Sequence, residues 1–326
     1  MKAIVNTGPG VLQLLEFPVP VAGPGEARVR TACCGICATD VRMVAGWDRT
    51  GFPTIPGHEW SGVVDSVGPG VDPGLRGLPC VGENIRSDGG EVGFEHPGGY
   101  GEYFLTEASN LHPIDPVMPL HTAPLIEPLA VAVHVLGRLG RAVGADEPVL
   151  VIGDGAIGLL VTAVLRKRGC RGVSLLGGRP PRLAIAKDLG AAAVANYHDF
   201  PDGLAKGMHS AFGRRFPLVF EASGAHEAMD AALEVAEGRG TVVEVGDYGS
   251  ARAAFPWVLV LHGELTIIGS NASAGAWPEA VRLARDLPLE RLATHRLPAA
   301  RFAEGMALMR ARDPSVVKIM LDWRSP

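Results

Sequence analysis

The pattern of apolar and polar positions divides the chain into two parts of different texture. In the first part, up to about residue 125, short apolar segments alternate with turns rich in Gly and Pro, such as those at 22–25 and 68–74. This pattern is typical of an irregular β domain built from short strands. We expect strands at residues 1–6, 27–32, 62–67 and 103–106.

From residue 148 the pattern changes to apolar strands that alternate with helical stretches rich in Ala and Leu. Repeated strand and helix units at this spacing predict an α/β fold with a doubly wound parallel sheet. Helices and a short strand follow this region. The expected strands are at 149–152, 172–176, 192–195, 217–222, 240–245, 264–269 and 316–321, and the expected helices at 158–167, 182–189, 227–237, 277–287 and 299–312.

A glycine-rich loop joins the first of these strands to the following helix. Gly153, Gly155 and Gly158 form G-x-G-x-x-G at that junction. The first glycine permits a tight turn, the second lets the backbone approach a pyrophosphate, and the third allows close packing of helix and strand. We expect a dinucleotide site that includes Ala156 and Ile157. The alternatives are a methyltransferase-like nucleotide site or simple turn glycines.

The second strand of the same region bears on the choice of dinucleotide. Sites for NAD usually carry an acid about 20 residues beyond the loop, where it binds the ribose 2′-hydroxyl. This chain has Gly177 and Gly178 there, which leave room, and Arg179 and Arg182 follow. Guanidinium groups bind a 2′-phosphate well. These four residues, with Val245 after a later strand, complete the expected cofactor site, unless the arginines are simply solvated.

Cys37, His58 and Glu127 provide the residue types of a catalytic zinc site. Cysteine, histidine and carboxylate ligands can hold zinc and leave one coordination position open. These residues lie far apart in the sequence, so their spacing alone does not identify them as the ligands of one metal site. Taken singly, they also fit a buried thiol, a hydrogen-bonded loop histidine and an acid at a helix start. Cys34 and Cys37 form C-x-x-C, which leaves a redox pair as a further alternative.

Composition and charge exclude several classes of protein. The chain is 47% hydrophobic, which is enough for a large core. Its formal net charge is −5, and the sequence contains no run of basic residues that would bind nucleic acid. The apolar stretch at 149–165 is interrupted by Asp154 and is too short to cross a membrane. Five cysteines fit reduced thiols better than a disulfide framework, and we expect a cytoplasmic protein.

The order of four motifs identifies a family. G-I-C-x-T-D at 35–40 is followed by G-H-E-x-x-G-x-V at 57–64, E-P-L-A-V-A-x-H at 127–134 and the glycine-rich loop. Over essentially its whole length the chain resembles the zinc-dependent medium-chain alcohol dehydrogenases, most closely their sorbitol and polyol branch. The resemblance implies a GroES-like catalytic domain at 1–128 and 269–326. It also implies an inserted Rossmann domain at 129–268, with the active site in the cleft between the domains.

The resemblance also assigns roles to single residues. Cys37 and His58 match zinc ligands, and Glu127 stands at the place of the third protein ligand with Glu59 as a second candidate. Either glutamate binds zinc directly or through water. Asp40 matches the carboxylate that orients the ligand histidine.

The resemblance extends to the proton path and the cofactor. Thr39 matches the hydroxyl that takes the substrate proton, and Arg182 matches an arginine near the adenosine ribose. Many relatives place a histidine at the position of Arg42, and because a guanidinium does not lose its proton, the relay must end at water or another group.

Two further departures bear on zinc and cofactor. The segment 84–103 contains no cysteine, so a structural zinc cannot be bound there and we expect one catalytic zinc per chain. The acid typical of NAD-preferring members is missing after the second strand, so we expect NADP to be preferred over NAD.

The sequence therefore predicts a zinc-dependent oxidoreductase that transfers a hydride between a secondary alcohol and a nicotinamide cofactor. A sugar, polyol or amino alcohol is the expected small-molecule substrate, and a homodimer or homotetramer the expected assembly. One alternative is a zinc-free enone or quinone reductase, which would not need Cys37, His58 and Glu127. Another is a dinucleotide-binding protein without turnover.

Overall fold

The computed structural model describes residues 1–47, 49–249 and 256–325. The chain divides into two compact units. One consists of Met1–Glu127 together with Trp277–Pro326, and the other is Pro128–Ala276. The family resemblance implied that the chain returns to the first unit at residue 269. In the structure it returns at Trp277, after the last strand of the second unit and the loop that follows that strand.

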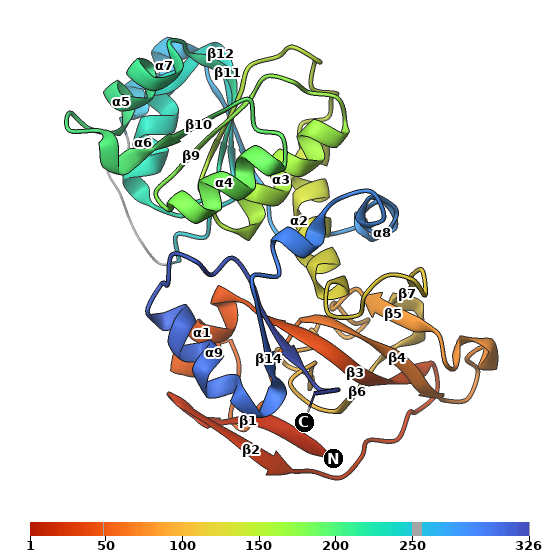
Figure 1. The fold of residues 1–326 in the computed structure, drawn as a ribbon. Helices are drawn as coiled ribbons and strands as arrows, with labels where there is room; N and C mark the ends of the chain where they lie inside the picture. Colours follow the sequence, from red (N-terminus) through yellow and green to blue (C-terminus); the bar gives the residue numbers. More distant parts are fainter. Residues whose placement is uncertain (48, 250–255, 326) are drawn as a thin grey trace. The chain divides into compact units, whose positions relative to one another are not determined.

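The first unit is built on a mostly antiparallel sheet around one long strand, with β14 and β15 paired in parallel (Figure 1). Within the described residues the order is β14-β15-β3-β4-β5-β7, with β6 also paired to β3, and β1 and β2 form a separate pair. The strands are β1 Lys2–Gly8, β2 Val11–Glu16, β3 Glu26–Ile36, β4 Glu59–Val67, β5 Pro79–Gly82, β6 Tyr103–Glu107, β7 Leu111–Pro113, β14 His295–Pro298 and β15 Ile319–Asp322.

Apolar side chains of these strands form the core of the first unit. Trp60 and Phe104 pack edge to face with ring centroids 4.8 Å apart, and Ile36 and Ile319 are fully buried. Such burial of large side chains holds β3 in the centre of the sheet, which fixes the segments that follow it. The helices of this unit are α1 Ala38–Gly46, α8 Trp277–Ala284 and α9 Phe302–Arg310, and α2 Ile126–Gly137 begins in it.

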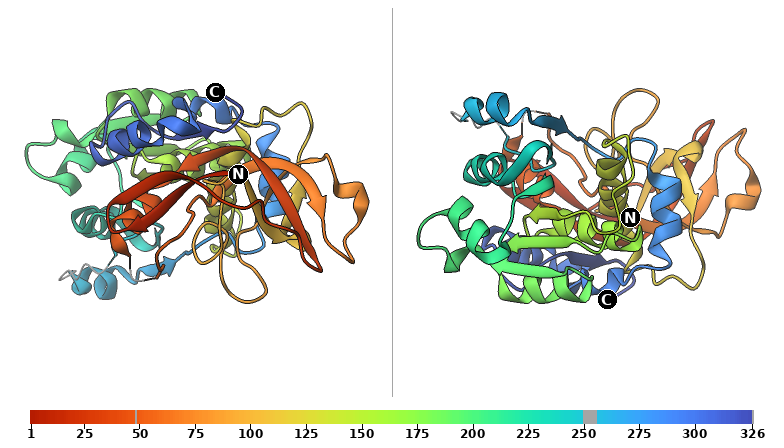
Figure 2. Two further views of the ribbon diagram at one scale, coloured as in Figure 1. Left: turned by 90° about the horizontal axis from the view of Figure 1, so that it is seen from below. Right: turned by 90° about the horizontal axis from the view of Figure 1, so that it is seen from above.

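The second unit is a doubly wound parallel sheet with the strand order β10-β9-β8-β11-β12-β13 in the part of the chain that the structure describes. Because parallel crossovers are right-handed and the order reverses between β8 and β11, the helices cover both faces (Figure 2). The strands are β8 Val149–Ile152, β9 Val173–Gly177, β10 Ala193–Asn196, β11 Phe216–Glu221, β12 Ala236–Glu244 and β13 Thr266–Gly269. The helices are α3 Ala156–Lys167, α4 Pro180–Asp188, α5 Leu204–Phe212, α6 His226–Val235 and α7 Trp257–Gly263.

Several predicted elements differ in extent from those observed. Helix α6 ends at Val235 rather than 237, because Ala236 already pairs with Phe216 and begins β12. Ala299–Arg301 forms a separate 3-10 turn before α9. The strand predicted from 316 begins only at Ile319, where pairing with β3 starts. Helices α1, α2, α5 and α7 were not predicted.

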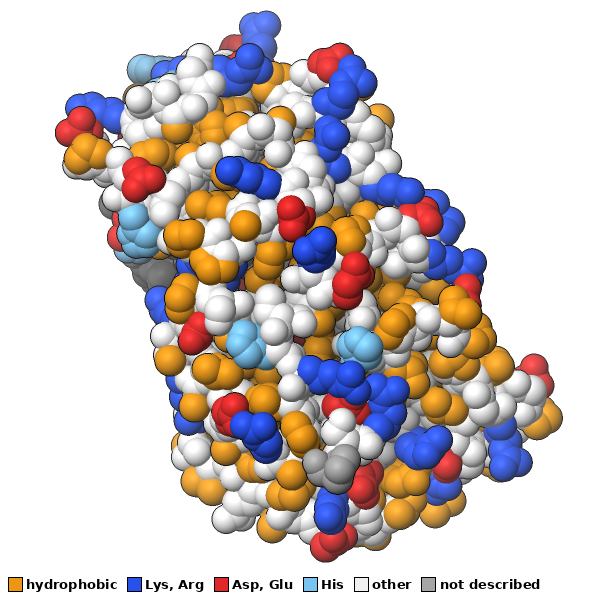
Figure 3. Space-filling model, in the orientation of Figure 1, with side chains coloured by type: hydrophobic (Ala, Val, Ile, Leu, Met, Phe, Trp, Pro, Cys, Tyr) orange, Lys and Arg blue, Asp and Glu red, His pale blue; other side chains and the backbone are white. Residues whose placement is uncertain are grey.

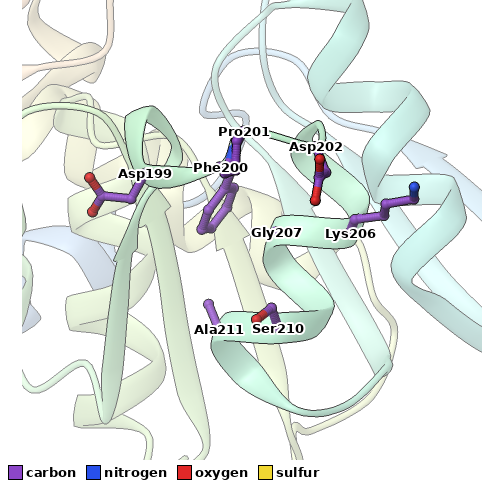
Figure 4. Close-up of a pocket in the computed structure, with 8 residues that line it drawn as sticks. All are labelled: Asp199, Phe200, Pro201, Asp202, Lys206, Gly207, Ser210 and Ala211. Carbon is purple, nitrogen blue, oxygen red and sulfur yellow. The ribbon is translucent and has the colours of Figure 1, made fainter.

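The surface carries charges of both signs. On the face shown in Figure 3, basic and acidic side chains are mixed among apolar ones. A surface hollow beside α5, drawn in Figure 4, is lined by residues 199–202, 206, 207, 210 and 211. Phe200 packs there so closely that a Cβ at Gly207 would lie 2.1 Å from its ring. The hollow is therefore explained by the packing of α5. No helix of the described chain is long and apolar enough to cross a membrane.

Candidate active site

Three residues of the first unit converge on one point. Cys37 follows β3 and begins α1, while His58 and Glu59 stand at the start of β4. Strands β3 and β4 pair with Gly35 opposite Glu59, so the sheet register brings the two segments together. One ligand atom of each residue lies within 4.8 Å of those of the other two.

The polar atoms of this cluster fit a metal ion. Glu59 is 1% exposed and His58 is 6% exposed. Glu59 Oε2 is buried and has no hydrogen-bond partner, whereas His58 Nδ1 faces the Asp40 carboxylate. Buried polar atoms almost always have a partner, so an orphaned carboxylate oxygen beside a cysteine and a histidine indicates a cation as the missing partner. A thiolate, an imidazole and a carboxylate are the donor set that zinc prefers.

Asp40 links the start of α1 to the histidine. Its buried carboxylate accepts hydrogen bonds from the Cys37 backbone N–H at 2.8 Å and from the Tyr100 hydroxyl at 3.1 Å. The second oxygen, Oδ1, lies 3.5 Å from His58 Nδ1. Burial lowers the pKa of His58, but the negative charges of Asp40 and Cys37 outweigh it and raise that pKa well above its usual value. Tyr100 was not predicted from the sequence.

Lys318 is a further charged residue of the cluster that the sequence analysis missed. It is 6% exposed, precedes β15 and forms an ion pair with Glu59 Oε1. Strand β15 pairs with β3 at Ile319 and Ile36, which carries Lys318 to the ligand cluster. The only sequence signal was a lysine inside the apolar segment 316–321.

Glu127 lies outside the group of three ligand atoms. It stands in the first turn of α2 and is half-buried. Burial and the charge of Glu59 raise the pKa of Glu127 to about 7, while His58 and Lys318 act in the opposite direction. The carboxyl group of Glu127 therefore interacts electrostatically with the residues of the cluster but is not one of the three converging ligands.

Thr39 lies beside the cluster at the start of α1. Its Oγ1 is 3.6 Å from Cys37 Sγ, and the residue is half-buried. Arg42 follows one helical turn later, and its guanidinium lies 5.1 Å from the centroid of the Trp47 ring. Phe94 packs on His58 with ring centroids 4.9 Å apart and forms an apolar wall there.

The C-x-x-C pair does not have the properties of a redox site. Cys34 and Cys37 are both free thiols, and Cys34 is fully buried on β3. Burial raises the pKa of Cys34 well above its usual value, with the charge of Asp40 adding to the effect. A thiol that does not ionise is a poor nucleophile for disulfide exchange.

The glycine-rich loop of the second unit has the geometry that a pyrophosphate needs. Gly153 has φ +122°, and a Cβ at Gly158 would lie 2.1 Å from the Gly153 carbonyl oxygen, so neither position tolerates a side chain. A Cβ at Gly155 would meet no atom within 4 Å. Ala156 and Ile157 begin α3, whose first amides have no side-chain cap. The open side of the loop therefore presents a helix N-terminus suited to an anion.

Val245 lies at the same edge of the parallel sheet. It follows β12, and its backbone N–H donates to the Glu221 carbonyl at 2.8 Å. The buried Glu221 carboxylate at the end of β11 accepts hydrogen bonds from the Ser223 backbone N–H at 2.8 Å and from the Tyr248 hydroxyl. These contacts order the segments at the carboxyl ends of β11 and β12, where ligands of doubly wound sheets bind.

The expected space beyond β9 is filled, which corrects the sequence analysis. A Cβ at Gly177 would lie 2.6 Å from the Cβ of Asp154, and a Cβ at Gly178 would lie 2.3 Å from the Tyr197 ring. The carboxylate of Asp154 also contacts both arginines, Arg179 at 2.8 Å and Arg182 at 3.7 Å. The sequence predicted open space at these glycines. The space is filled because the acid, Asp154, comes from the glycine-rich loop after β8 and not from β9.

Comparisons with known proteins agree with this geometry. Residues 23–116 match the model of the alcohol dehydrogenase GroES-like domain, and residues 156–286 match that of the zinc-binding dehydrogenases. The galactitol 1-phosphate 5-dehydrogenase of Escherichia coli K12 is 30% identical, over 98% of this chain and 99% of its own. The D-altritol 5-dehydrogenase of Agrobacterium fabrum is 29% identical over 98% of each chain.

A solved structure shows the same fold. It is a short-chain alcohol dehydrogenase from Escherichia coli CFT073 complexed with NADH, with a TM-score of 0.91 and 25% identity over 99% of each chain. The chain is thus an oxidoreductase with a Rossmann cofactor domain and a GroES-like domain. It belongs to the zinc-dependent medium-chain alcohol dehydrogenase family, whose members transfer a hydride between an alcohol and a nicotinamide cofactor.

The ion pair of Lys318 yields a stability prediction. Replacing Lys318 with Met leaves the buried Glu59 carboxylate without its cation, which typically costs about 3 to 5 kcal/mol. We expect the metal-free Lys318→Met variant to lose that much free energy of unfolding in urea titrations. Lys206→Met, which removes an exposed lysine from α5, is the matched control. A loss of less than about 1 kcal/mol would show that Lys318 does not compensate Glu59.

Proposed function

We propose that this protein interconverts a polyol or sugar alcohol and the corresponding ketone, using one zinc ion and a nicotinamide dinucleotide. The observation that carries the proposal is the convergence of Cys37, His58 and Glu59, with Glu59 Oε2 buried and unpaired. The names of the relatives support the substrate class, because those described above act on altritol and on galactitol 1-phosphate.

The zinc site comprises Cys37, His58 and Glu59, with Glu127 as the alternative carboxylate. When bound, zinc supplies a Lewis acid that lowers the pKa of a coordinated alcohol. Asp40 holds the His58 ring in place, and Lys318 balances the charge of Glu59. A single zinc per chain is supported by the state of the other thiols, because burial raises the pKa of Cys33 and of Cys80 to about 12.

Thr39 is the proposed proton acceptor for the alcohol. Its hydroxyl lies beside Cys37, and it is exposed enough to pass a proton towards water. Arg42 stays protonated and does not continue the relay, so water is its proposed end. Phe94 excludes water from one side of His58.

The dinucleotide site comprises Gly153, Gly155, Ala156, Ile157, Gly158 and Val245, together with the residues after β9. The open space at Gly155 and the uncapped start of α3 support it. The sequence predicts a preference for NADP, in which Arg179 and Arg182 would meet a 2′-phosphate, and that preference is not part of the present proposal. Both arginines contact the Asp154 carboxylate, which competes with a 2′-phosphate for them.

A substrate screen tests the proposed reaction. Purified protein would be assayed with polyols, aldoses, cyclitols and amino alcohols, and with NAD and NADP, by the absorbance of the reduced nicotinamide. We expect turnover with polyols that is lost after zinc removal and restored by zinc. Reduction of enones or quinones that survives zinc removal would instead favour the zinc-free reductase.

We also propose that the chain forms a homodimer or homotetramer. Strand β13 has one neighbour, β12, and forms an edge of the parallel sheet among the described strands. Nearby on α7, Trp257 is 62% and Leu261 73% exposed, which is unusual for large apolar side chains at the surface. An apolar surface next to a sheet edge is suited to contact with a second copy of the chain.

This surface gives a testable prediction. We expect the Leu261→Glu variant to shift the protein towards the monomer in light scattering coupled to size-exclusion chromatography, because a carboxylate is costly in an apolar interface. Val117→Glu, at a position 85% exposed in the first unit, is the matched control. A monomeric wild type, or an assembly unchanged by Leu261→Glu, would remove this surface as the interface.

The free state of the described cysteines supports a reducing compartment. We therefore propose the cytoplasm as the location.

A further inference from the structure

The side chain of Asp154 lies where a dinucleotide site normally recognises the adenosine ribose. In Rossmann domains an acid at the end of the second strand binds the ribose hydroxyl. The second strand here is β9, which ends at Gly177. A Cβ built on Gly177 would lie 2.6 Å from Asp154 Cβ and 2.7 Å from Asp154 Oδ2. The phosphate loop thus supplies a carboxylate at the point towards which a side chain at position 177 would project.

The donors at this point are directed at that carboxylate. The backbone N–H groups of Gly178 and Arg179 donate to Asp154 Oδ2 at 2.9 and 2.8 Å. Arg179 Nη1 donates to Oδ1 at 2.8 Å, and Arg182 Nη1 lies 3.7 Å from the same oxygen. Asp154 is 3% exposed, so solvent screens these contacts weakly.

The start of α4 offers few other donors for an anion. A helix N-terminus ordinarily presents several free N–H groups. Pro180 and Pro181 are the first two residues of α4, and proline has no N–H. The amides of Gly178 and Arg179 directly precede these two prolines, and both already donate to Asp154.

We infer that Asp154 is a specificity-determining residue that selects NAD over NADP. A 2′-phosphate at this site would face a buried carboxylate of like charge, and the two amides and Arg179 Nη1, which could bind it, already donate to that carboxylate. A 2′-hydroxyl carries no charge and avoids this repulsion. This selectivity is opposite to the NADP preference predicted from the sequence, because that prediction considered Arg179 and Arg182 without Asp154. The inference rests on the dinucleotide site of the proposed function.

Equilibrium binding measured by isothermal titration calorimetry tests the inference without using activity. The probes are NADH, NADPH, and the fragments 5′-AMP and adenosine 2′,5′-bisphosphate. We expect wild-type protein to bind NADH at least about tenfold more tightly than NADPH, and 5′-AMP more tightly than the bisphosphate. The fragments isolate the ribose contribution, because they lack the nicotinamide.

Variants then show whether Asp154 excludes the 2′-phosphate or instead positions the arginines to bind it. In Asp154→Ser the carboxylate is gone, and we expect NADPH to bind at least about tenfold more tightly than it binds wild type, with a much smaller change for NADH. Adding Arg179→Ala to this variant should remove the gain, because the freed guanidinium is then missing. Asp146→Ser is the matched control: it removes an exposed carboxylate paired with Arg171 in the same unit and should leave the ratio of affinities unchanged.

Three results would overturn the inference: a wild type that binds NADPH more tightly than NADH, a wild type without selectivity, and weaker NADPH binding in Asp154→Ser. The last would show that Asp154 positions the arginines for the phosphate. If Asp154→Ser does not fold, the wild-type measurements with whole cofactors and fragments decide alone. Failure of wild type to bind either dinucleotide would overturn the dinucleotide part of the proposed function as well, so the two failures are distinguishable.

Discussion

Replacing Cys37 with alanine should abolish zinc binding and lower turnover by at least about 10³-fold, and His58→Ala should do the same. The basis is that one ligand atom from each of these residues converges with one from Glu59 within 4.8 Å. The Lewis acidity of the metal contributes several kcal/mol to the reaction, and each 1.4 kcal/mol is about a factor of ten in rate. Elemental analysis and steady-state kinetics on the same preparations measure both effects.

The controls separate loss of the metal from loss of the fold. Cys34→Ala removes a neighbouring thiol that is buried on β3 and lies outside the proposed ligand set. We expect that variant to keep its zinc, with at most a loss of stability from the small cavity. Cofactor binding to Cys37→Ala should remain, because the dinucleotide site lies in the second unit. Full activity in Cys37→Ala would remove this residue from the reaction.

Replacing Thr39 with valine should lower turnover by about 10² to 10⁴-fold while leaving zinc content and cofactor affinity nearly unchanged. Valine keeps the shape of the side chain and removes the hydroxyl, which lies 3.6 Å from Cys37 Sγ. The range is that of a positioned group that accepts a proton in the transition state. Kinetics with a deuterated alcohol would add a second measure, since slow proton removal changes the isotope effect on hydride transfer.

A Thr39→Ser variant is the matched comparison. Serine retains the hydroxyl, so most of the turnover should return if proton transfer is the role of Thr39. Equal losses in Thr39→Val and Thr39→Ser would indicate packing at the start of α1 as the cause. Near-normal turnover in Thr39→Val would exclude the hydroxyl from the proton path.

The sequence was most informative where function requires local motifs. Gly153 and Gly158 were predicted from their spacing, and the structure shows a positive φ at the first and, at the second, a carbonyl oxygen where a Cβ would lie. Cys37 and His58 were found through the order of motifs along the chain. Their convergence then follows from the pairing of β3 with β4, which also brings in Glu59.

The sequence was least informative where distant segments meet. Lys318 reaches Glu59 only because β15 pairs with β3, a contact between residues 259 positions apart. Asp154 was seen only as an interruption of an apolar stretch, yet its carboxylate folds across to Gly178 and Arg179. Because an acid at a ribose site is expected at the end of the second strand, an acid supplied by the loop was not predicted.

Zinc content measured together with activity tests the central claim most directly. Elemental analysis of purified, active protein should give about one zinc per chain. Removal of the metal by a chelator should abolish alcohol oxidation, and one equivalent of zinc should restore it, because the proposed site is built from Cys37, His58 and a carboxylate. An active preparation without zinc, or one that requires two zinc ions per chain, would contradict the account.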